Sequence, residues 1–160
     1  RLALNPAATL NEQRQVLTQS ALAFSEAVSL DSGNGQAWAD RAYATELWAR
    51  LAPAQMNELG RDAETYANEA LSRSLDVPEF WVRRGVALDM QGRWEDSGEA
   101  FMKALELARF NATYWFYYAY HQSLRPHNGS EVNKSIENCL RLDPENGSAL
   151  ALRQRINQSP

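Results

Sequence analysis

The residues that could carry metal or acid–base chemistry are few, and their spacing does not suit it. The two histidines, His121 and His127, are six positions apart with Pro126 between them, so they do not share a helix face. No Glu-x-x-His or His-x-x-x-His spacing accompanies them, and a zinc site needs three or four ligands. We interpret both histidines as surface residues and predict neither a metal nor a cofactor.

Nucleophilic and phosphate-binding patterns are equally weak. Cys139 is the single cysteine, so it cannot form an internal disulfide, and no histidine is placed by sequence to activate its thiol. We expect it to be a buried small residue. Glu95, Asp96 and Glu106 follow predicted helix surfaces and indicate a solvated face rather than paired catalytic carboxylates. The glycines near 33–35 and 91–92 are typical of turns. The sequence therefore predicts a protein that is not an enzyme.

One aromatic run is the most unusual feature of the chain. It reads Tyr-Trp-Phe-Tyr-Tyr-Ala-Tyr-His over residues 114–121. Trp115, Tyr118 and Ala119 have the spacing of a helical core face. Phe116 and Tyr120, four apart, form a neighbouring stripe that the core face does not account for. This second stripe either binds a partner or packs on neighbouring helices.

The elements that must position these side chains read as helices alone. Apolar periodicity, capping residues and breakers predict helices near 10–30, 36–51, 61–75, 78–91, 94–109, 112–124, 130–142 and 147–157. Thr9 and Glu12 have the spacing of a capping box. Pro53 is expected to end a helix, and Gly60 to act as a stop or turn. The fold class is all-α.

A repeat underlies these helices. Trp81 and Trp115 are 34 residues apart, and Trp38 precedes Trp81 by 43, which leaves nine extra residues around 51–60. We expect those residues to extend or cap the preceding helix. The clearest unit begins at Pro78 and carries Trp81, Gly85, Leu88, Gly92, Trp94, Ser97, Phe101 and Ala104. Here Trp and Leu fill the space between helical hairpins, and Gly and Ala let helix backbones approach.

This pattern resembles the tetratricopeptide repeat. The resemblance implies a right-handed α-solenoid of antiparallel helix hairpins, with about three to four repeats and a capping helix at 147–157. The units would be approximately 1–34, 35–77, 78–111 and 112–146, within one domain over residues 1–160. Arg109 stands at the usual proline site, so we expect the helix before it to run on by part of a turn.

The resemblance also places a concave groove. The stripe that faces it would carry Ala39, Tyr43 and Glu46 in one unit and Val82, Val86 and Asp89 in the next. Phe116 and Tyr120 would continue it. The groove residues predicted to bind a partner are Tyr43, Glu46, Val82, Val86, Asp89, Phe116 and Tyr120. The Lys and Asn residues with which some relatives grip a terminal carboxylate are absent from these positions, so that activity does not carry over.

Charge and hydropathy limit the classes of partner that the chain could bind. The net charge is −4 and the pI about 5.2, which disfavours nucleic acid because phosphate binding needs a basic patch. No stretch has the ~18–20 uncharged apolar residues of a membrane span. The chain starts at Arg1 without methionine, so we expect a fragment of a longer protein. The sequence assigns no compartment.

The function predicted first is a protein–protein interaction module. Its apolar and aromatic groove, flanked by acidic residues, suits a peptide or protein with apolar anchors and some basic charge. Two alternatives stay open. The repeats could self-associate or play a structural role, or the chain could be a non-catalytic appendage of a larger enzyme, for example one of the bacterial envelope.

Overall fold

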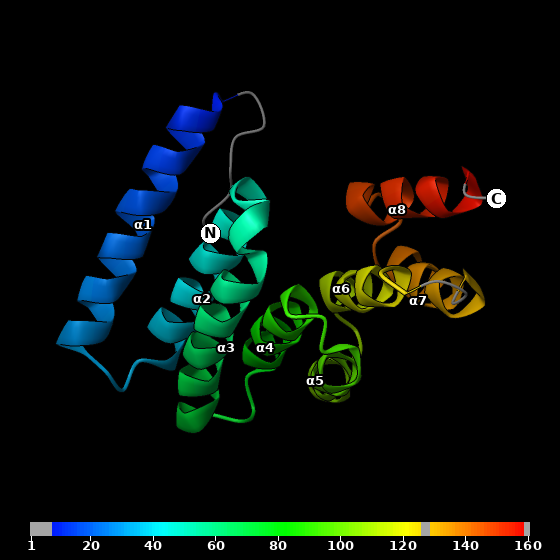
Figure 1. Ribbon diagram of the computed structural model, residues 1–160. Helices are drawn as coiled ribbons and strands as arrows, with labels where there is room; N and C mark the ends of the chain where they lie inside the picture. Colours follow the sequence, from blue (N-terminus) through cyan, green and yellow to red (C-terminus); the bar gives the residue numbers. More distant parts are fainter. Residues whose placement is uncertain (1–7, 126–128, 159–160) are drawn as a thin grey trace.

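The computed structural model describes residues 8–125 and 129–158, and most of these are helical. The helices are α1 (Leu10–Leu30), α2 (Gly35–Leu51), the 3₁₀ turn η1 (Pro53–Gln55), α3 (Met56–Arg73), α4 (Pro78–Met90), α5 (Trp94–Leu107), α6 (Ala112–Ser123), α7 (Gly129–Leu142) and α8 (Gly147–Gln158). Figure 1 shows them in chain order, from blue α1 at one end to red α8 at the other. The described residues contain no strand, and the all-α prediction is confirmed.

The helices pair in antiparallel fashion into a right-handed solenoid. α2 packs on α3, α4 on α5 and α6 on α7. In addition α2 contacts α4, α4 contacts α6 and α6 contacts α8, whereas within the described chain α3, α5 and α7 do not contact one another. The even-numbered helices therefore converge on the inner, concave side. We keep 35–77, 78–111 and 112–146 as proposed units because each contains one helix pair.

The three repeat tryptophans occupy equivalent places. Each is half-buried, and each donates its indole N–H to a carbonyl oxygen six residues earlier in the chain. Trp38 bonds to Ser32 at 3.1 Å, Trp81 to Leu75 at 2.9 Å and Trp115 to Arg109 at 2.8 Å. Each indole N–H thus links its helix to the loop that precedes it.

Asparagine caps three of the four even-numbered helices, which are those that begin the repeat units and the terminal helix. The side-chain oxygens of Asn34, Asn111 and Asn146 accept backbone N–H groups at the starts of α2, α6 and α8. α4 starts instead with Pro78 in its first turn, where the missing N–H costs nothing. The capping box at Thr9 and Glu12 is confirmed at the start of α1. The core is rich in alanine, which lets the paired helices lie close.

Two glycines are required by close helix contacts. A Cβ on Gly85 would lie 2.9 Å from the ring of Phe101, so α4 approaches α5 there. A Cβ on Gly60 would lie 3.0 Å from Met90 and Gln91 side-chain atoms and 3.1 Å from the Ala87 carbonyl oxygen. The prediction that Gly60 stops a helix is wrong. It lies inside α3, where the absence of a side chain lets α3 cross α4.

The nine extra residues also differ from the expectation. Pro53 does end α2, at Leu51. The segment around it lengthens both helices of the pair and not the first alone. α2 has 17 residues against 13 in α4 and 12 in α6, and α3 has 18 against 14 in each of α5 and α7. The expected extension of the first helix is therefore only part of what the extra residues do. The predicted extension of α5 is wrong. α5 ends at Leu107, and the Ala108 N–H bonds back to the Ala104 carbonyl oxygen before the chain turns at Arg109. The turn expected around Pro126 and His127 lies outside the described residues.

Candidate functional site: the concave groove

Three helices line the groove with residues in one repeat register. Gln36, Asp40 and Tyr43 on α2 are followed 43 positions later by Glu79, Arg83 and Val86 on α4, and 34 positions after those by Thr113, Tyr117 and Tyr120 on α6. Each set has the i, i+4, i+7 spacing of one helix face. Two hollows lie along this face, one near the starts of the three helices and one near their ends.

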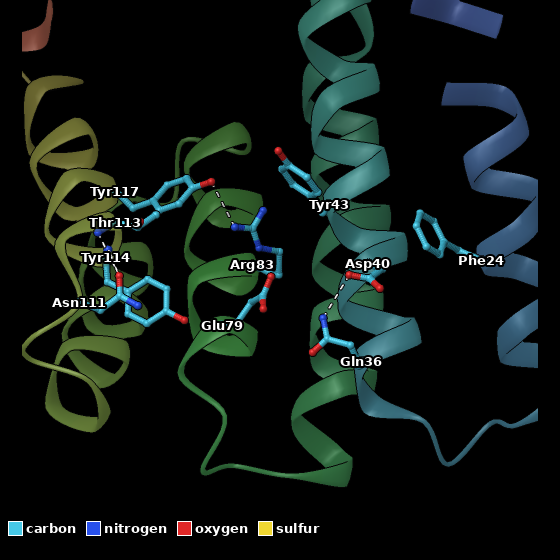
Figure 2. Close-up of a pocket in the computed structure, with 10 residues that line it drawn as sticks. All are labelled: Phe24, Gln36, Asp40, Tyr43, Glu79, Arg83, Asn111, Thr113, Tyr114 and Tyr117. Atoms are coloured by element: carbon cyan, nitrogen blue, oxygen red, sulfur yellow. Dashed lines mark hydrogen bonds between the residues drawn. The ribbon is translucent and has the colours of Figure 1, made fainter. Parts of the chain in front are cut away.

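The first, which we call the polar hollow, has a volume of about 360 Å³. Figure 2 shows its ten residues: Phe24, Gln36, Asp40, Tyr43, Glu79, Arg83, Asn111, Thr113, Tyr114 and Tyr117. Asp40 accepts a hydrogen bond from Gln36 at 3.1 Å. No ion pair among the described residues involves Asp40 or Glu79. These two carboxylates therefore give this end of the groove a negative potential.

The second, which we call the apolar hollow, has a volume of about 210 Å³. Its walls are mostly apolar and aromatic, with Arg50 also among them and Glu46 and Asp89 the acidic members. The apolar and aromatic residues are Ala49, Met56, Val86, Met90, Trp94, Phe101, Tyr117, Tyr120 and Leu124. Tyr120 is 42% exposed and Leu124 38% exposed, so the hollow opens to solvent over two large apolar side chains. Tyr117 lines both hollows.

Arg83 separates the two hollows. Its guanidinium lies over the rings of Tyr43 and Tyr117, at 4.6 and 5.3 Å from the ring centroids. Figure 2 shows it between these two rings. Its Nη1 donates to Glu46 Oε2 at 2.6 Å, and its Nη2 donates to the Tyr117 hydroxyl at 3.3 Å. Arg83 is 4% exposed. One buried cation on α4 thus holds α2 and α6 on either side of it.

Burial sets the protonation behaviour of this pair. Desolvation raises the pKa of Glu46 to about 7, against the opposing effect of Arg83. Burial alone would lower the pKa of Arg83, but the Glu46 carboxylate and the Tyr117 hydroxyl raise it, so the guanidinium stays charged. Burial also raises the pKa of Tyr43. The Glu46 carboxylate is therefore held in place by an arginine that does not titrate.

A second buried cluster lies beneath the apolar hollow. His121 Nδ1 lies 2.7 Å from Asp89 Oδ1 and 3.2 Å from Ser97 Oγ. Ser97 is fully buried, and its hydroxyl donates to the Gly85 carbonyl oxygen at 2.9 Å. Both partners approach the same ring nitrogen, so this trio lacks the order of a nucleophile, base and orienting acid. Its role is to join α4, α5 and α6.

The structure brings part of the predicted groove set to the surface. Tyr43 lines the polar hollow, and Val86 and Tyr120 line the apolar hollow. Val82 is fully buried against Phe101 and Ala104. Phe116 is half-buried against the cluster formed by α6, α7 and α8, so of the two readings left open for this stripe, packing on neighbouring helices applies to it.

The two predicted acidic residues also lie deeper than expected. Glu46 is 2% exposed and is paired with Arg83, and Asp89 is paired with His121. The expectation that Glu46 presents free negative charge is therefore wrong, because Arg83 pairs with it. Asp89 is hydrogen-bonded to His121 and nearly buried, and Asp40 and Glu79 carry acidic charge at the other end of the groove. His121, expected at the surface, is buried because Asp89 and Ser97 pair with it. Cys139 is buried, as predicted.

Sequence reasoning missed Asp40, Arg83 and Tyr117. They stand one residue after Ala39, Val82 and Phe116 and replace those positions in the observed groove face, whereas Tyr43, Val86 and Tyr120 belong to both the predicted and the observed face. A signal was present. Arg83 and Tyr117 are 34 residues apart, as are Trp81 and Trp115. An arginine in repeat register with a tyrosine next to an aromatic stripe indicates a cation–aromatic contact across repeats.

The paired helices, the repeated tryptophans and the hollowed inner face define a tetratricopeptide repeat fold, which confirms the resemblance found in the sequence. No protein-family model matches the chain, and no curated protein matches it either. Solved structures do match it in fold. The chain is similar to MamA, with a TM-score of 0.63 and 11% identity over 98% of this chain and 95% of that one.

Two further structures are similar. YrrB, described as a TPR protein with an unusual peptide-binding site, gives a TM-score of 0.55 and 15% identity over 91% of this chain and 88% of that one. A MamA RS-1 ArsTM double mutant gives a TM-score of 0.50 and 11% identity over 85% of this chain and 90% of that one. Among the residues described here, no helix combines the length and apolar character needed to cross a bilayer.

Proposed function

We propose that this chain is a non-catalytic protein-binding module, and that its concave groove holds a segment of a partner protein. The observation that carries the proposal is the pair of adjoining hollows on the concave face, one acidic and one apolar. A fold that hosts peptide binding in YrrB adds support. The partner segment that fits has an apolar anchor for the apolar hollow and a Lys or Arg for Asp40 and Glu79.

The groove sets the spacing of these two features. Glu79 and Val86 mark the two hollows on α4 and are seven residues apart, which is about 10 Å along a helix. An extended strand rises about 3.3 Å per residue. The basic residue and the apolar anchor should therefore be about three positions apart in an extended partner segment.

The test is a selection of short displayed random peptides on the immobilised chain, followed by affinity measurements on the enriched peptides. Enriched peptides should combine an apolar residue with a Lys or Arg. Replacing both Tyr120 and Leu124 with Ala should weaken their binding by about tenfold or more, because exposed aromatic and apolar anchors dominate such interfaces. Replacing Asp40 with Asn and Glu79 with Gln should weaken it less and reduce its salt dependence.

The matched control is the pair Leu107→Ala and Phe110→Ala, which removes apolar side chains that are 44% and 79% exposed and line neither groove hollow. Circular dichroism on every variant checks that the helices persist. The proposal fails if no peptide is enriched, or if the groove variants bind the enriched peptides as tightly as the unaltered chain does.

Self-association is a second candidate, and a different surface favours it. Phe110 is 79% exposed beside a third hollow of about 520 Å³ that includes Met102, Trp115 and Tyr118. Solvent-exposed apolar surface of this kind is typical of protein interfaces. Sedimentation of the chain over a range of concentrations, with and without Phe110→Ser, tests this. A monomer at all concentrations would contradict it.

A further inference from the structure

The apolar hollow contains an acceptor that nothing in the described chain satisfies. Glu46 lines this hollow and is 2% exposed, so it belongs to the bottom of the hollow and not to its rim. Its Oε2 accepts from Arg83, but its Oε1 is buried and has no hydrogen-bond partner among the described residues. A buried acceptor without a partner is costly. The hollow therefore favours an occupant that brings a hydrogen-bond donor to its floor.

The walls restrict what else the occupant is made of. Met56, Met90, Val86 and Leu124 are aliphatic or thioether side chains, and Trp94, Phe101, Tyr117 and Tyr120 add aromatic rings. Methionine and aromatic walls pack well on a flat aromatic ring. A volume of about 210 Å³ is smaller than the roughly 300–1,000 Å³ of small-molecule sites, so the hollow suits a single side chain.

The charges around the hollow disfavour a cationic tip on that side chain. Glu46 is already paired with Arg83, and Asp89 Oδ1 is already hydrogen-bonded to His121. Arg50 also lines the hollow and acts electrostatically on Glu46. An ammonium at the floor would lose its hydration and lie near two guanidinium groups. A neutral N–H donor meets neither penalty.

Tryptophan is the side chain that combines a large apolar ring with a single N–H donor and no acceptor. We propose that the apolar hollow seats the indole of a partner tryptophan, whose N–H donates to Glu46 Oε1. This inference rests on the proposed function and specifies its apolar anchor. The basic residue of the partner remains at the polar hollow, over Asp40 and Glu79.

Small-molecule probes test the proposed indole site in the apolar hollow, and they do not require a known partner. Indole, benzothiophene and n-butylammonium are titrated separately into the chain labelled with ¹³C at its methionine methyl groups. Benzothiophene has the shape of indole with sulfur in place of N–H. The chain has three methionines. Met56 and Met90 line the hollow, whereas Met102, which is 52% exposed, lines the third hollow and therefore reports any binding of the probes there instead.

Indole should shift the Met56 and Met90 signals saturably while leaving Met102 in place. Benzothiophene should bind about tenfold more weakly, because it cannot donate to the carboxylate. The Glu46→Gln variant keeps an oxygen acceptor without charge, so the difference between the two probes should shrink there. The Tyr120→Ala variant removes a wall and should weaken both probes equally.

Several results would overturn the inference. They are equal or tighter binding of benzothiophene, preference for n-butylammonium, a larger shift at Met102 than at Met56 and Met90, or no saturable shift. The outcome is separable from that of the proposed function. If indole binds but the peptide selection fails, the proposed peptide-binding function is refuted while the indole site in the apolar hollow stands. If the enriched peptides bind in the groove but show no preference for tryptophan, the peptide-binding function stands and the indole site is refuted.

Discussion

Arg83 is the residue that connects the groove to the stability of the fold. It is buried, it lies between two tyrosine rings, and it forms an ion pair with Glu46. Such a pair adds little net stability, since two charges lose their hydration, but removal of one partner leaves the other uncompensated. The pair is therefore better understood as a device that fixes the distances among α2, α4 and α6.

The buried carboxylate of this pair gives a pH dependence. Glu46 has a pKa of about 7 in the folded chain and about 4.5 in the unfolded chain, so the folded state binds more protons between these values. The stabilisation from Glu46 is complete below about pH 4.5 and is lost as the pH rises through about 7, by up to about 3 kcal/mol. Urea unfolding of the unaltered chain and of Glu46→Gln at several pH values measures this.

The quantity to compare is the difference in the free energy of unfolding between the two proteins at each pH. This difference should move against the unaltered chain as the pH rises, because the glutamine does not titrate. A difference that is constant with pH, or that moves the other way, would show that Glu46 stays ionised in the folded chain.

Residue-level prediction from the sequence succeeded where the signal was local and failed where it was not. Cys139 stands at a small-residue position of the repeat and is buried accordingly. His121 and Asp89 are 32 residues apart in the sequence, and no local sequence pattern predicts their hydrogen bond. The predicted groove stripe shares Tyr43, Val86 and Tyr120 with the observed one but contains Ala39 and Val82 where the groove has Asp40 and Arg83. Helical periodicity identifies a core face well, but the packing of α5 and α7 decides how far each neighbouring stripe is turned from it.

At the scale of the elements, caps and breakers predicted most helix ends within two residues. The start of α3 and the nature of Gly60 were the exceptions. A glycine stops a helix or permits a close crossing, and the sequence of one helix cannot distinguish these, because the difference lies in the backbone of the neighbouring α4. Likewise Arg109 did not extend α5, since its carbonyl oxygen accepts the Trp115 indole N–H in the loop.

The crossing of α4 and α5 gives a prediction about stability. Gly85→Ala places a Cβ 2.9 Å from the ring of Phe101, which is 1% exposed and has no room to move. We expect a loss of roughly 1–3 kcal/mol in the free energy of unfolding, although alanine is the better helix former. Gly147→Ala is the control, since nothing lies within 4 Å of its Cβ position at the start of α8.

Both variants are measured by denaturant unfolding. The close contact is refuted if Gly85→Ala is as stable as the unaltered chain, or if the Gly147→Ala control loses as much.

The whole molecule is held together by contacts between neighbours along the array. α1 contacts α2 alone among the other helices, whereas α4 contacts α2, α3, α5 and α6. In such arrays stability is close to a sum of unit and interface contributions, and the ends open before the middle. The exposed side chains of Leu10, Leu22 and Leu30 on α1 fit this weaker attachment.

Amide hydrogen exchange tests whether the ends of the array open more readily than its middle. Backbone amides in the middle of α1 should exchange faster than those in the middle of α4, because α1 has a single neighbour to hold it. α8, which contacts both α6 and α7, should be intermediate. Equal protection of α1 and α4 would show that the array unfolds only as a whole.

The nine residues that lengthen the interval between Trp38 and Trp81 have a consequence for how this array could be redesigned. They become the last turn of α2, η1 and the first turn of α3, and they bring Met56 to the wall of the apolar hollow. An idealised array built from identical 34-residue modules would keep the stack and the tryptophan ties, yet it would leave that wall out. Binding preference in this chain is thus encoded partly by an irregularity of length, which a consensus of the repeats would erase.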